Sequence, residues 1–403
     1  MPSTPKILFL IADGMGDWPG PGDKKTPLAE AETPNMDALA RHCCAGLIQT
    51  VPPGMAPGSD TANMALIGFD PQKHLTGRGP VEAAAQGLKL APNDLVFRLN
   101  LVTVTEPNTK GLMLDYSAGH IDTAKSTELI LDLREFLRKL LGGEDFALYP
   151  GVQYRHLLVL KKKADSTESR LHVRPPHDIT GRKIAPDLET FERSPVLSGL
   201  FYGAARRLAA ASNTTPANAV WPWGQGRSLF LPDFREAYGL KGAVISAVDL
   251  VKGLGRASRM TVLDVAGATG LLDTNYAGKV RAALDFLEQG DFVYLHVEAP
   301  DECGHAGNRE EKIEAVARFD AQIVGPLRKA LAERDVAFFI TCDHLTPLRE
   351  KTHVSDPVPF LLNHPKCREH KLSAFTEETA GKTGLFIDPG HTTLSWVRKK
   401  IFS

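Results

Sequence analysis

The sequence has few of the features that mark membrane, secreted or redox-active proteins. Its first apolar run, Ile7 to Ala12, spans six residues and is too short for a membrane span or the hydrophobic part of a signal sequence, and no later run is longer. Cysteine is also scarce. No CxxC pair occurs, and the odd number favours free thiols in a reducing compartment: Cys43, Cys44, Cys303, Cys342 and Cys367. We therefore expect a cytoplasmic protein that does not associate with membranes.

An excess of charge is missing as well. The 47 Lys and Arg residues balance 48 Asp and Glu residues, which leaves a net charge of −1 with His neutral. Nucleic-acid binding normally requires a clear basic excess, so nucleic acid is not expected as a partner. Apolar residues make up 43% and charged residues 24%, as in globular proteins, which excludes wholesale disorder. None of these features specifies an oligomeric state.

Strands and helices alternate along much of the chain. Five short apolar segments are predicted as buried strands: residues 6–12, 243–248, 260–265, 292–297 and 337–341. The clearest amphipathic helix is 126–141, because its leucines recur at helical spacing and Gly142-Gly143 follows. Further helices are predicted at 275–288 and 310–332. This order favours an α/β fold with a mostly parallel sheet and helices on both faces.

The pattern changes in the middle of the chain. A short strand is predicted at 156–160, followed by a polar turn and a partner strand at 171–174, and the stretch that follows has few long apolar runs. We therefore predict a core domain formed by residues 1–116 and 225–403. A smaller α+β domain is predicted to be inserted between them, at 117–224.

Residues of the metal-ligand type follow several of the predicted strands. Asp13 ends the first strand, Asp301 and His305 follow the strand at 292–297, Asp343-His344 follows 337–341, and His353 comes next. Sites in open α/β sheets form at the carboxyl ends of strands, so these side chains are expected to converge. Three carboxylates with three imidazoles form a mixed oxygen and nitrogen ligand set, which suits two divalent ions such as Mn²⁺ or Zn²⁺. An all-oxygen cage of the kind that holds Mg²⁺ or Ca²⁺ is not expected, although Mg²⁺ is a further candidate.

Each of these residues alone has an ordinary structural explanation. An Asp at a strand end commonly forms a turn or caps a helix, and a single His such as His353 is usually a surface or core residue. The metal interpretation therefore depends on the conjunction, because chance rarely places such residues after so many strands.

Ser59 is the candidate nucleophile. It lies in the segment Pro57-Gly58-Ser59-Asp60, where a glycine permits close approach to a ligand and a helix is expected to begin. The free N–H groups of a helix N-terminus favour a phosphoryl group, and a nearby metal ion would activate the serine hydroxyl. The structural alternative is that Ser59 merely caps the helix.

These segments together resemble a known enzyme family, the archaeal-type cofactor-independent phosphoglycerate mutases of the alkaline phosphatase superfamily. The resemblance covers nearly the whole chain and rests on five motifs: Ala12-Asp-Gly-Met-Gly-Asp17, Pro57-Gly-Ser-Asp-Thr-Ala-Asn63, Ala299-Pro-Asp-Glu-Cys-Gly-His305, Cys342-Asp-His344 and Lys351-Thr-His-Val-Ser-Asp-Pro-Val-Pro-Phe360. It implies a dinuclear metal site and an alkaline-phosphatase-like fold.

The resemblance also implies roles for individual residues. One ion would be held by Asp301, His305 and His353, and the other by four further ligands: Asp13, Ser59, Asp343 and His344. Ser59 would take the phosphoryl group from 3-phosphoglycerate, and the 2-hydroxyl of the glycerate would take it back, without a bisphosphoglycerate cofactor. The expected partner is therefore a small anionic phosphorylated substrate.

The inserted domain would close over this substrate and exclude water. Candidates for binding its phosphate and carboxylate, or for moving protons, are His120, Arg155, His156, His177, Asp178 and Lys279. Arg155 is favoured because a guanidinium on a strand can grip an oxyanion with two hydrogen bonds. The alternative for every one of these residues is ordinary surface charge.

Three other functions remain open at this point. Several segments of the inserted region, including Gly151-Val-Gln-Tyr-Arg-His156, look most like a bacterial branch of the family that has been proposed to act as a homoserine kinase. Trp221 and Trp223 would then stack a nucleotide base, although the chain has no GxxxxGK[ST] loop. A phosphatase of the same superfamily and a non-catalytic metal-binding protein are the remaining alternatives.

Overall fold

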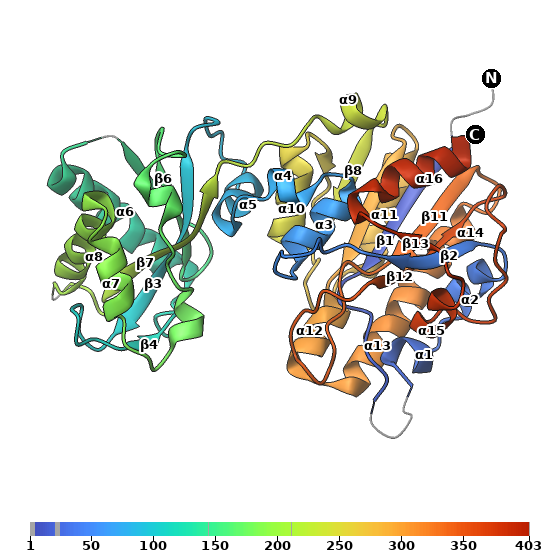
Figure 1. Cartoon of the computed structure of the whole chain (residues 1–403), viewed down its shortest axis with the longest axis horizontal. Helices are drawn as coiled ribbons and strands as arrows, with labels where there is room; N and C mark the ends of the chain where they lie inside the picture. Colours follow the sequence, from blue (N-terminus) through green and yellow to red (C-terminus); the bar gives the residue numbers. More distant parts are fainter. Residues whose placement is uncertain (1–4, 21–24, 144, 211, 403) are drawn as a thin grey trace. The chain divides into compact units, whose positions relative to one another are not determined.

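The computed structural model describes residues 5–20, 25–143, 145–210 and 212–402, and the chain forms two compact units (Figure 1). Residues 1–75 and 231–403 form the first, which we call the core unit, and residues 76–230 form the second, the inserted unit. The inserted unit therefore begins and ends outside the predicted limits of 117 and 224. The reason is β3 (Leu95–Val104), which pairs with β6 (Arg155–Leu160) and β7 (Ala219–Arg227) of the inserted unit.

The core unit is built on an eight-stranded sheet in the order β13-β2-β12-β11-β1-β10-β8-β9. Its strands are β1 (Lys6–Ala12), β2 (Cys44–Ile48), β8 (Gly242–Ile245), β9 (Thr261–Val262), β10 (Phe292–Val297), β11 (Val336–Thr341), β12 (Val358–Asn363) and β13 (Phe386–Ile387). Pairing is parallel except where β12 meets β11 and β2. The central strands β1, β10 and β11 are almost wholly apolar and buried, as expected for strands covered on both faces.

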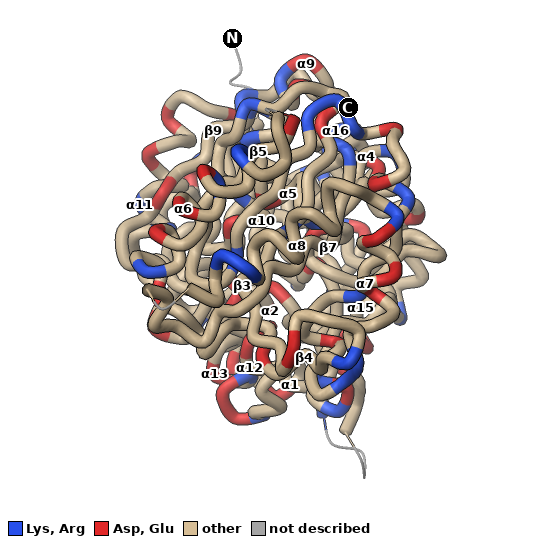
Figure 2. Tube along the Cα trace, turned by 90° about the vertical axis from the view of Figure 1, so that its left-hand side faces the viewer, with Lys and Arg blue, Asp and Glu red and all other residues tan. Residues whose placement is uncertain are grey.

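Helices cover both faces of this sheet, and α16 lies in front of it in Figure 1. The core-unit helices are α1 (Pro27–Glu30), α2 (Pro34–Ala40), α3 (Ser59–Ile67), α4 (Pro71–His74), α9 (Phe234–Tyr238), α10 (Asp249–Ala257), α11 (Tyr276–Leu287), α12 (Ala299–Ala306), α13 (Arg309–Phe319), α14 (Gly325–Ala330), α15 (Glu377–Gly381) and α16 (Thr393–Phe402). None of the helices in the described residues is long and apolar enough to cross a membrane. In the trace of Figure 2, acidic positions gather at α12 and α13, whose first turns both carry carboxylates.

The single helix predicted at 310–332 is divided in the structure. α13 ends at Phe319, a π-helical turn occupies Asp320–Val324, and α14 begins at Gly325. Pro326 has no amide hydrogen to donate to the preceding turn, so regular α-helical bonding is interrupted before it.

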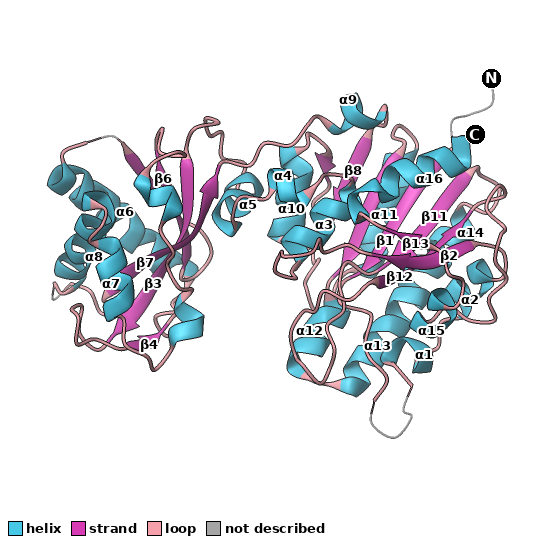
Figure 3. Cartoon of the chain, in the orientation of Figure 1, coloured by secondary structure: helices cyan, strands magenta, loops and turns pink. Residues whose placement is uncertain are grey.

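The inserted unit has an antiparallel sheet in the order β4-β3-β6-β5, with β7 on the other side of β3 (Figure 3). Its remaining elements are β4 (Met113–Asp115), β5 (Phe146–Tyr149), α5 (Arg78–Ala85), α6 (Thr123–Leu141), α7 (Ala185–Phe191), α8 (Pro195–Leu208) and two 3₁₀ turns, Thr167–Arg170 and Pro176–Ile179. The strand predicted at 171–174 does not form, and β3 and β5 pair with β6 instead.

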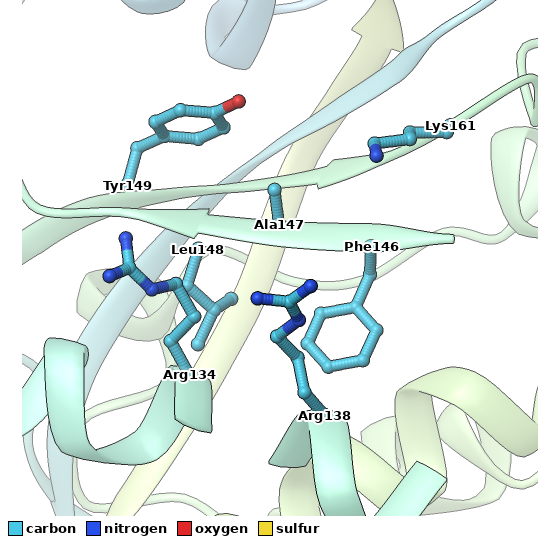
Figure 4. A pocket seen from close by; sticks show the side chains of 7 residues that line it. All are labelled: Arg134, Arg138, Phe146, Ala147, Leu148, Tyr149 and Lys161. Atoms are coloured by element: carbon cyan, nitrogen blue, oxygen red, sulfur yellow. The ribbon is translucent and has the colours of Figure 1, made fainter. Parts of the chain in front are cut away.

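The amphipathic helix α6 covers part of this sheet, as its leucine pattern predicts. Phe146 and Leu148 of β5 point towards α6 and are buried, whereas Ala147 and Tyr149 point to the opposite side of the strand (Figure 4). Gly142 ends the helix with φ at 68°, a left-handed conformation that glycine adopts without strain. A small cavity of about 220 Å³ remains where the arginines of α6 pass the edge of β5.

Candidate metal centre

The predicted ligand residues meet at the carboxyl edge of the central strands. Ile11 lies opposite Thr341 of β11, and Ala12 lies opposite Val297 of β10, so these three parallel strands end together. Asp13 follows β1 directly, α12 with Asp301 follows β10, and Asp343 follows β11. The structure thus brings the sequence motifs together as the topology of the sheet predicted.

One group of ligand atoms surrounds the start of α3. The Nε2 atom of His344 is 3.5 Å from Oδ1 of Asp13, 3.4 Å from Oδ2 of Asp343 and 3.1 Å from Oγ of Ser59. Ser59 is the first residue of α3, Gly58 before it supplies no side-chain cap, and Oδ1 of Asp60 accepts from the Thr61 amide at 2.9 Å. Asp13, Asp343 and His344 satisfy the spacing of a metal-binding group.

A second group lies beside the first. Oδ2 of Asp301 is 3.1 Å from Nε2 of His305, and its Oδ1 is 3.6 Å from Nε2 of His353. Asp301, His344 and His353 also satisfy the spacing of a metal-binding group, so His344 belongs to both groups. All seven predicted ligands are therefore gathered in one place.

The hydrogen bond made by Nδ1 of His305 directs its Nε2 atom towards the other predicted ligands. Nδ1 of His305 is 3.0 Å from the carbonyl oxygen of Lys351, which can only accept, so Nδ1 carries the proton. The Nε2 atoms of His305 and His353 then face each other at 3.0 Å. Two imidazole nitrogens at this distance require a proton or a metal ion between them.

The electrostatics also favour bound cations. Burial raises the pKa of Asp13 well above its ordinary value, and the charges of Asp343 and Asp301 raise it further. Oδ1 of Asp13 is buried without a hydrogen-bond partner among the described residues. The hydrogen bond to Asp301 raises the pKa of His305 to about 9, so a divalent cation bound at its Nε2 would replace a proton there. Buried carboxylates and imidazoles with an unpaired oxygen among them fit divalent cations.

Several residues that support this centre were not predicted. Asn63 donates from Nδ2 to the Ser59 carbonyl oxygen at 2.9 Å and to Oδ2 of Asp343 at 2.7 Å. The Tyr294 hydroxyl donates to Oδ1 of Asn63 at 2.5 Å. His296, fully buried in β10, places Nε2 3.1 Å from Oδ2 of Asp13. A signal for His296 was available, since it is the one strongly polar residue of an apolar strand next to β1.

Lys279 lies in the core unit and near the metal centre. It is fully buried on α11, and its Nζ donates to the His296 carbonyl oxygen at 2.9 Å. Burial lowers the pKa of Lys279 to about 8. Its link to the ligands therefore passes through His296, which contacts Asp13.

The other predicted substrate residues lie in the inserted unit, where three of them line one aromatic cluster. The His120 ring packs edge-on against Tyr116 and Tyr154, and the His177 ring packs against Tyr116 and Trp223. Arg155 extends over the Tyr154 ring, with 5.6 Å between the guanidinium carbon and the ring centroid. Asp178 is largely exposed and lies 3.5 Å from Nε2 of His177.

Arg98 is the most buried cation of this cluster and was not predicted. Its guanidinium carbon lies 4.4 Å from the centroid of the Trp223 ring, and Nη2 is 2.9 Å from Oε1 of Glu82. Burial lowers the pKa of Arg98, and the nearby charges of Arg78 and Arg155 contribute. A buried guanidinium held among cations and ring faces is suited to binding an anion.

His156 and Trp221 are buried inside the inserted unit and contribute to its packing. His156 is 1% exposed, its Nδ1 accepts from the Gly151 amide at 3.1 Å, and burial lowers its pKa to about 3. Trp221 is fully buried against Phe191 and Phe201, and its Nε1 donates to the Arg174 carbonyl oxygen at 3.0 Å. The interpretation of Trp221 as a base-stacking residue is therefore not supported.

Comparisons with known proteins show the family of this chain. A family model described as 2,3-bisphosphoglycerate-independent phosphoglycerate mutase matches residues 40–212. The enzyme of that name from Methanothrix thermoacetophila is 44% identical over 397 residues, which cover 96% of this chain and 97% of that protein.

Solved structures confirm the predicted α/β fold. A protein from Pyrococcus horikoshii gives a TM-score of 0.80 at 30% identity, over 99% of this chain and 97% of that one. A cofactor-independent phosphoglycerate mutase from Thermoplasma acidophilum gives 0.65 at 25% identity, over 98% of this chain and 99% of that one. The motifs, the fold and the sequence identity agree, and this chain belongs to the family of 2,3-bisphosphoglycerate-independent phosphoglycerate mutases.

Proposed function

We propose that this protein interconverts 3-phosphoglycerate and 2-phosphoglycerate through a phosphoserine at Ser59. The observation that carries this proposal is the position of Ser59: its Oγ lies 3.1 Å from Nε2 of His344, at the start of α3 and beside both groups of metal-binding residues. The full-length match to a protein named as a 2,3-bisphosphoglycerate-independent phosphoglycerate mutase supports it.

Two divalent cations, Mn²⁺ or Zn²⁺, fit the ligand atoms. Asp301, His305 and His353 would hold one, and the other would be held by Asp13, Ser59, Asp343 and His344. When bound, such ions supply positive charge that stabilises the serine alkoxide and the transferring phosphoryl group.

The chain's own residues position the transfer. In the first half, Oγ of Ser59 loses its proton and attacks phosphorus, the bond from phosphorus to the 3-oxygen of the substrate breaks, and that oxygen takes up a proton, which leaves glycerate in the site. In the second half, the 2-hydroxyl loses its proton and its oxygen attacks the phosphoserine, the bond from phosphorus to Oγ breaks, and Ser59 is regenerated as it takes up a proton. Asn63 fixes the Ser59 backbone, and the positive end of the α3 dipole, at Ser59, favours a phosphoryl group there. Because Ser59 stores the phosphoryl group, no bisphosphoglycerate is needed.

The aromatic and cationic cluster of the inserted unit is proposed to bind the anionic part of the substrate. Arg98 and Arg155 offer guanidinium groups that match a carboxylate in shape and charge, and His120 and His177 line the same cluster. The role of the inserted unit is therefore recognition, and the role of the core unit is chemistry.

The decisive experiment compares substrates on purified, Mn²⁺-loaded protein. We expect turnover of 3-phosphoglycerate and none of ATP with homoserine, and we expect Ser59→Ala to abolish the turnover. Ser198→Ala, on the surface of α8, serves as the matched control and should keep full activity. Turnover only of ATP with homoserine would reject the mutase and identify a kinase, and release of inorganic phosphate alone would identify a phosphatase.

A further inference from the structure

Thr346 connects the two groups of ligand residues. Its hydroxyl donates a hydrogen bond to Oδ1 of Asp301, and the hydroxyl oxygen Oγ1 of Thr346 is 3.2 Å from Nδ1 of His344. A hydroxyl has one hydrogen, and Asp301 receives it, so Nδ1 of His344 must carry the proton of the second bond. Thr346 thereby selects the tautomer in which the Nε2 lone pair of His344 faces Ser59, Asp13 and Asp343.

Lys312 holds the backbone of this threonine from a fully buried position on α13. Its ammonium group has three hydrogens and three acceptors: the Thr346 carbonyl oxygen at 2.8 Å, Oδ2 of Asp17 at 2.9 Å and the Gly16 carbonyl oxygen at 3.2 Å. Every donor of a buried charge is thus satisfied, and the compensating carboxylate is itself only 5% exposed.

The two loops held by Lys312 are those that carry the ligands. Gly16 and Asp17 belong to the loop that follows β1 and begins with Asp13, and Thr346 belongs to the loop that begins with Asp343. Asp17 ties the loops together a second time, because its Oδ2 accepts from the Leu348 amide at 3.1 Å. The loops also meet at Gly14, where an added Cβ would lie 2.6 Å from Oγ1 of Thr346.

We propose that Lys312 is a positioning residue of the metal centre, which acts through Thr346 and Asp17 to hold Asp301 and His344 in place for a divalent cation. This role rests on the proposed function, since it presupposes that the centre binds metal. Lys312 contacts no predicted ligand directly, and its effect therefore passes through hydrogen bonds around the ligands. Residues of this kind commonly change metal affinity 10–100-fold, about the size of effect expected here.

The test measures Mn²⁺ binding to the metal-stripped full-length chain by calorimetry and by electron paramagnetic resonance of the free ion. We expect Thr346→Val, which keeps the shape and loses the hydroxyl, to weaken binding about tenfold or more, and Thr346→Ser to retain it. Lys312→Met combined with Asp17→Asn removes both buried charges together and should also weaken binding at least about tenfold.

A stability control separates positioning from general damage. Asp320→Asn alters another buried carboxylate of the core unit, which accepts from the Met36 and Asn35 amides and contacts no ligand residue. It should lower the thermal midpoint and leave the Mn²⁺ dissociation constant unchanged. Wild-type affinity in both Thr346→Val and the double variant would overturn the positioning role. A wild-type chain that binds no Mn²⁺ would instead overturn the proposed function, and this inference with it.

Discussion

The core unit and the inserted unit present their polar side chains in different ways. In the core unit, the carboxylates of the predicted metal ligands lie just beyond the ends of buried parallel strands and are almost completely shielded from water. In the inserted unit, cations and histidines lie among aromatic rings on an antiparallel sheet, and several remain half-exposed. Under the proposed function, we therefore expect the core unit to carry out chemistry with metal ions and the inserted unit to bind an anion reversibly.

The strongest test of this comparison replaces a ligand of the core unit. Asp343→Asn keeps the size of the side chain and removes its charge, while turning an amide hydrogen towards Asn63 or the Gly14 amide. We expect kcat to fall about 10³-fold or more and the metal content per chain to drop, as measured by steady-state kinetics and elemental analysis. An unchanged metal content would show that Asp343 is not a ligand.

A second test addresses the crowding of the metal centre. An added Cβ at Gly14 would lie 2.5 Å from Oδ1 of Asp301, and Gly14 has φ at +60°, so Gly14→Ala should cost about 1–3 kcal/mol and reduce kcat. Gly54→Ala is the matched control, because φ is +83° and the position is open. Chemical denaturation and kcat would be measured for both. Equal effects on kcat would mean that backbone strain, and not displacement of Asp301, is responsible.

Substitutions in the inserted unit should change KM, whereas substitutions in the core unit should change kcat. Arg98→Lys keeps a positive charge beside Glu82 but loses the planar group that lies over Trp223. We expect KM for 3-phosphoglycerate to rise about tenfold, with kcat and metal content nearly unchanged. Arg207→Lys, in an exposed ion pair with Asp132 of the same unit, should have no effect. A fall in kcat or metal content for Arg98→Lys would contradict the proposal that the inserted unit binds the substrate while the core unit carries out the chemistry.

The smallest expected effect is a pH dependence of stability in the inserted unit. Burial lowers the pKa of His156 to about 3, whereas an unfolded histidine titrates near 6.5, so the unfolded chain binds the proton first. The stability present above pH 6.5 is therefore lost as the pH falls towards 3, by about 2 kcal/mol between pH 7 and 5. His156→Gln should flatten this dependence in urea unfolding monitored by the inserted-unit tryptophans. An unchanged slope would show that His156 is not buried in its neutral form.

The sequence was most informative for the predicted metal ligands that directly follow strands. The strands at 6–12 and 292–297 form with the predicted limits, and Asp13, Asp301 and Asp343 converge because the parallel strands before them end at one edge. Hydrogen-bond partners such as Asn63, His296 and Thr346 escaped prediction, because their importance depends on which atoms face them in three dimensions. Arg98 was missed for a similar reason: only the pairing of β3 with β7 brings it to Trp223.

The inserted unit was harder to predict than the core unit. Its sheet is antiparallel and joins residues that are far apart in the sequence. Closeness in sequence predicts that a strand at 171–174 pairs with 156–160, whereas the partner of β6 is β3. The prediction of one long helix at 310–332 used the apolar period, which the helical segments do follow. It did not take account of Pro326, next to which the helix is divided. Local periodicity thus predicts the elements well and their pairing poorly.

The proposed function is tested most directly by looking for the phosphoryl group on Ser59. Protein mixed with radiolabelled 3-phosphoglycerate, quenched in acid within one turnover and mapped by peptide mass spectrometry, should carry label on Ser59. The label should be absent from Ser59→Ala, which should also fail to form 2-phosphoglycerate. Formation of 2-phosphoglycerate by Ser59→Ala, or turnover with the label on another residue, would contradict the central claim.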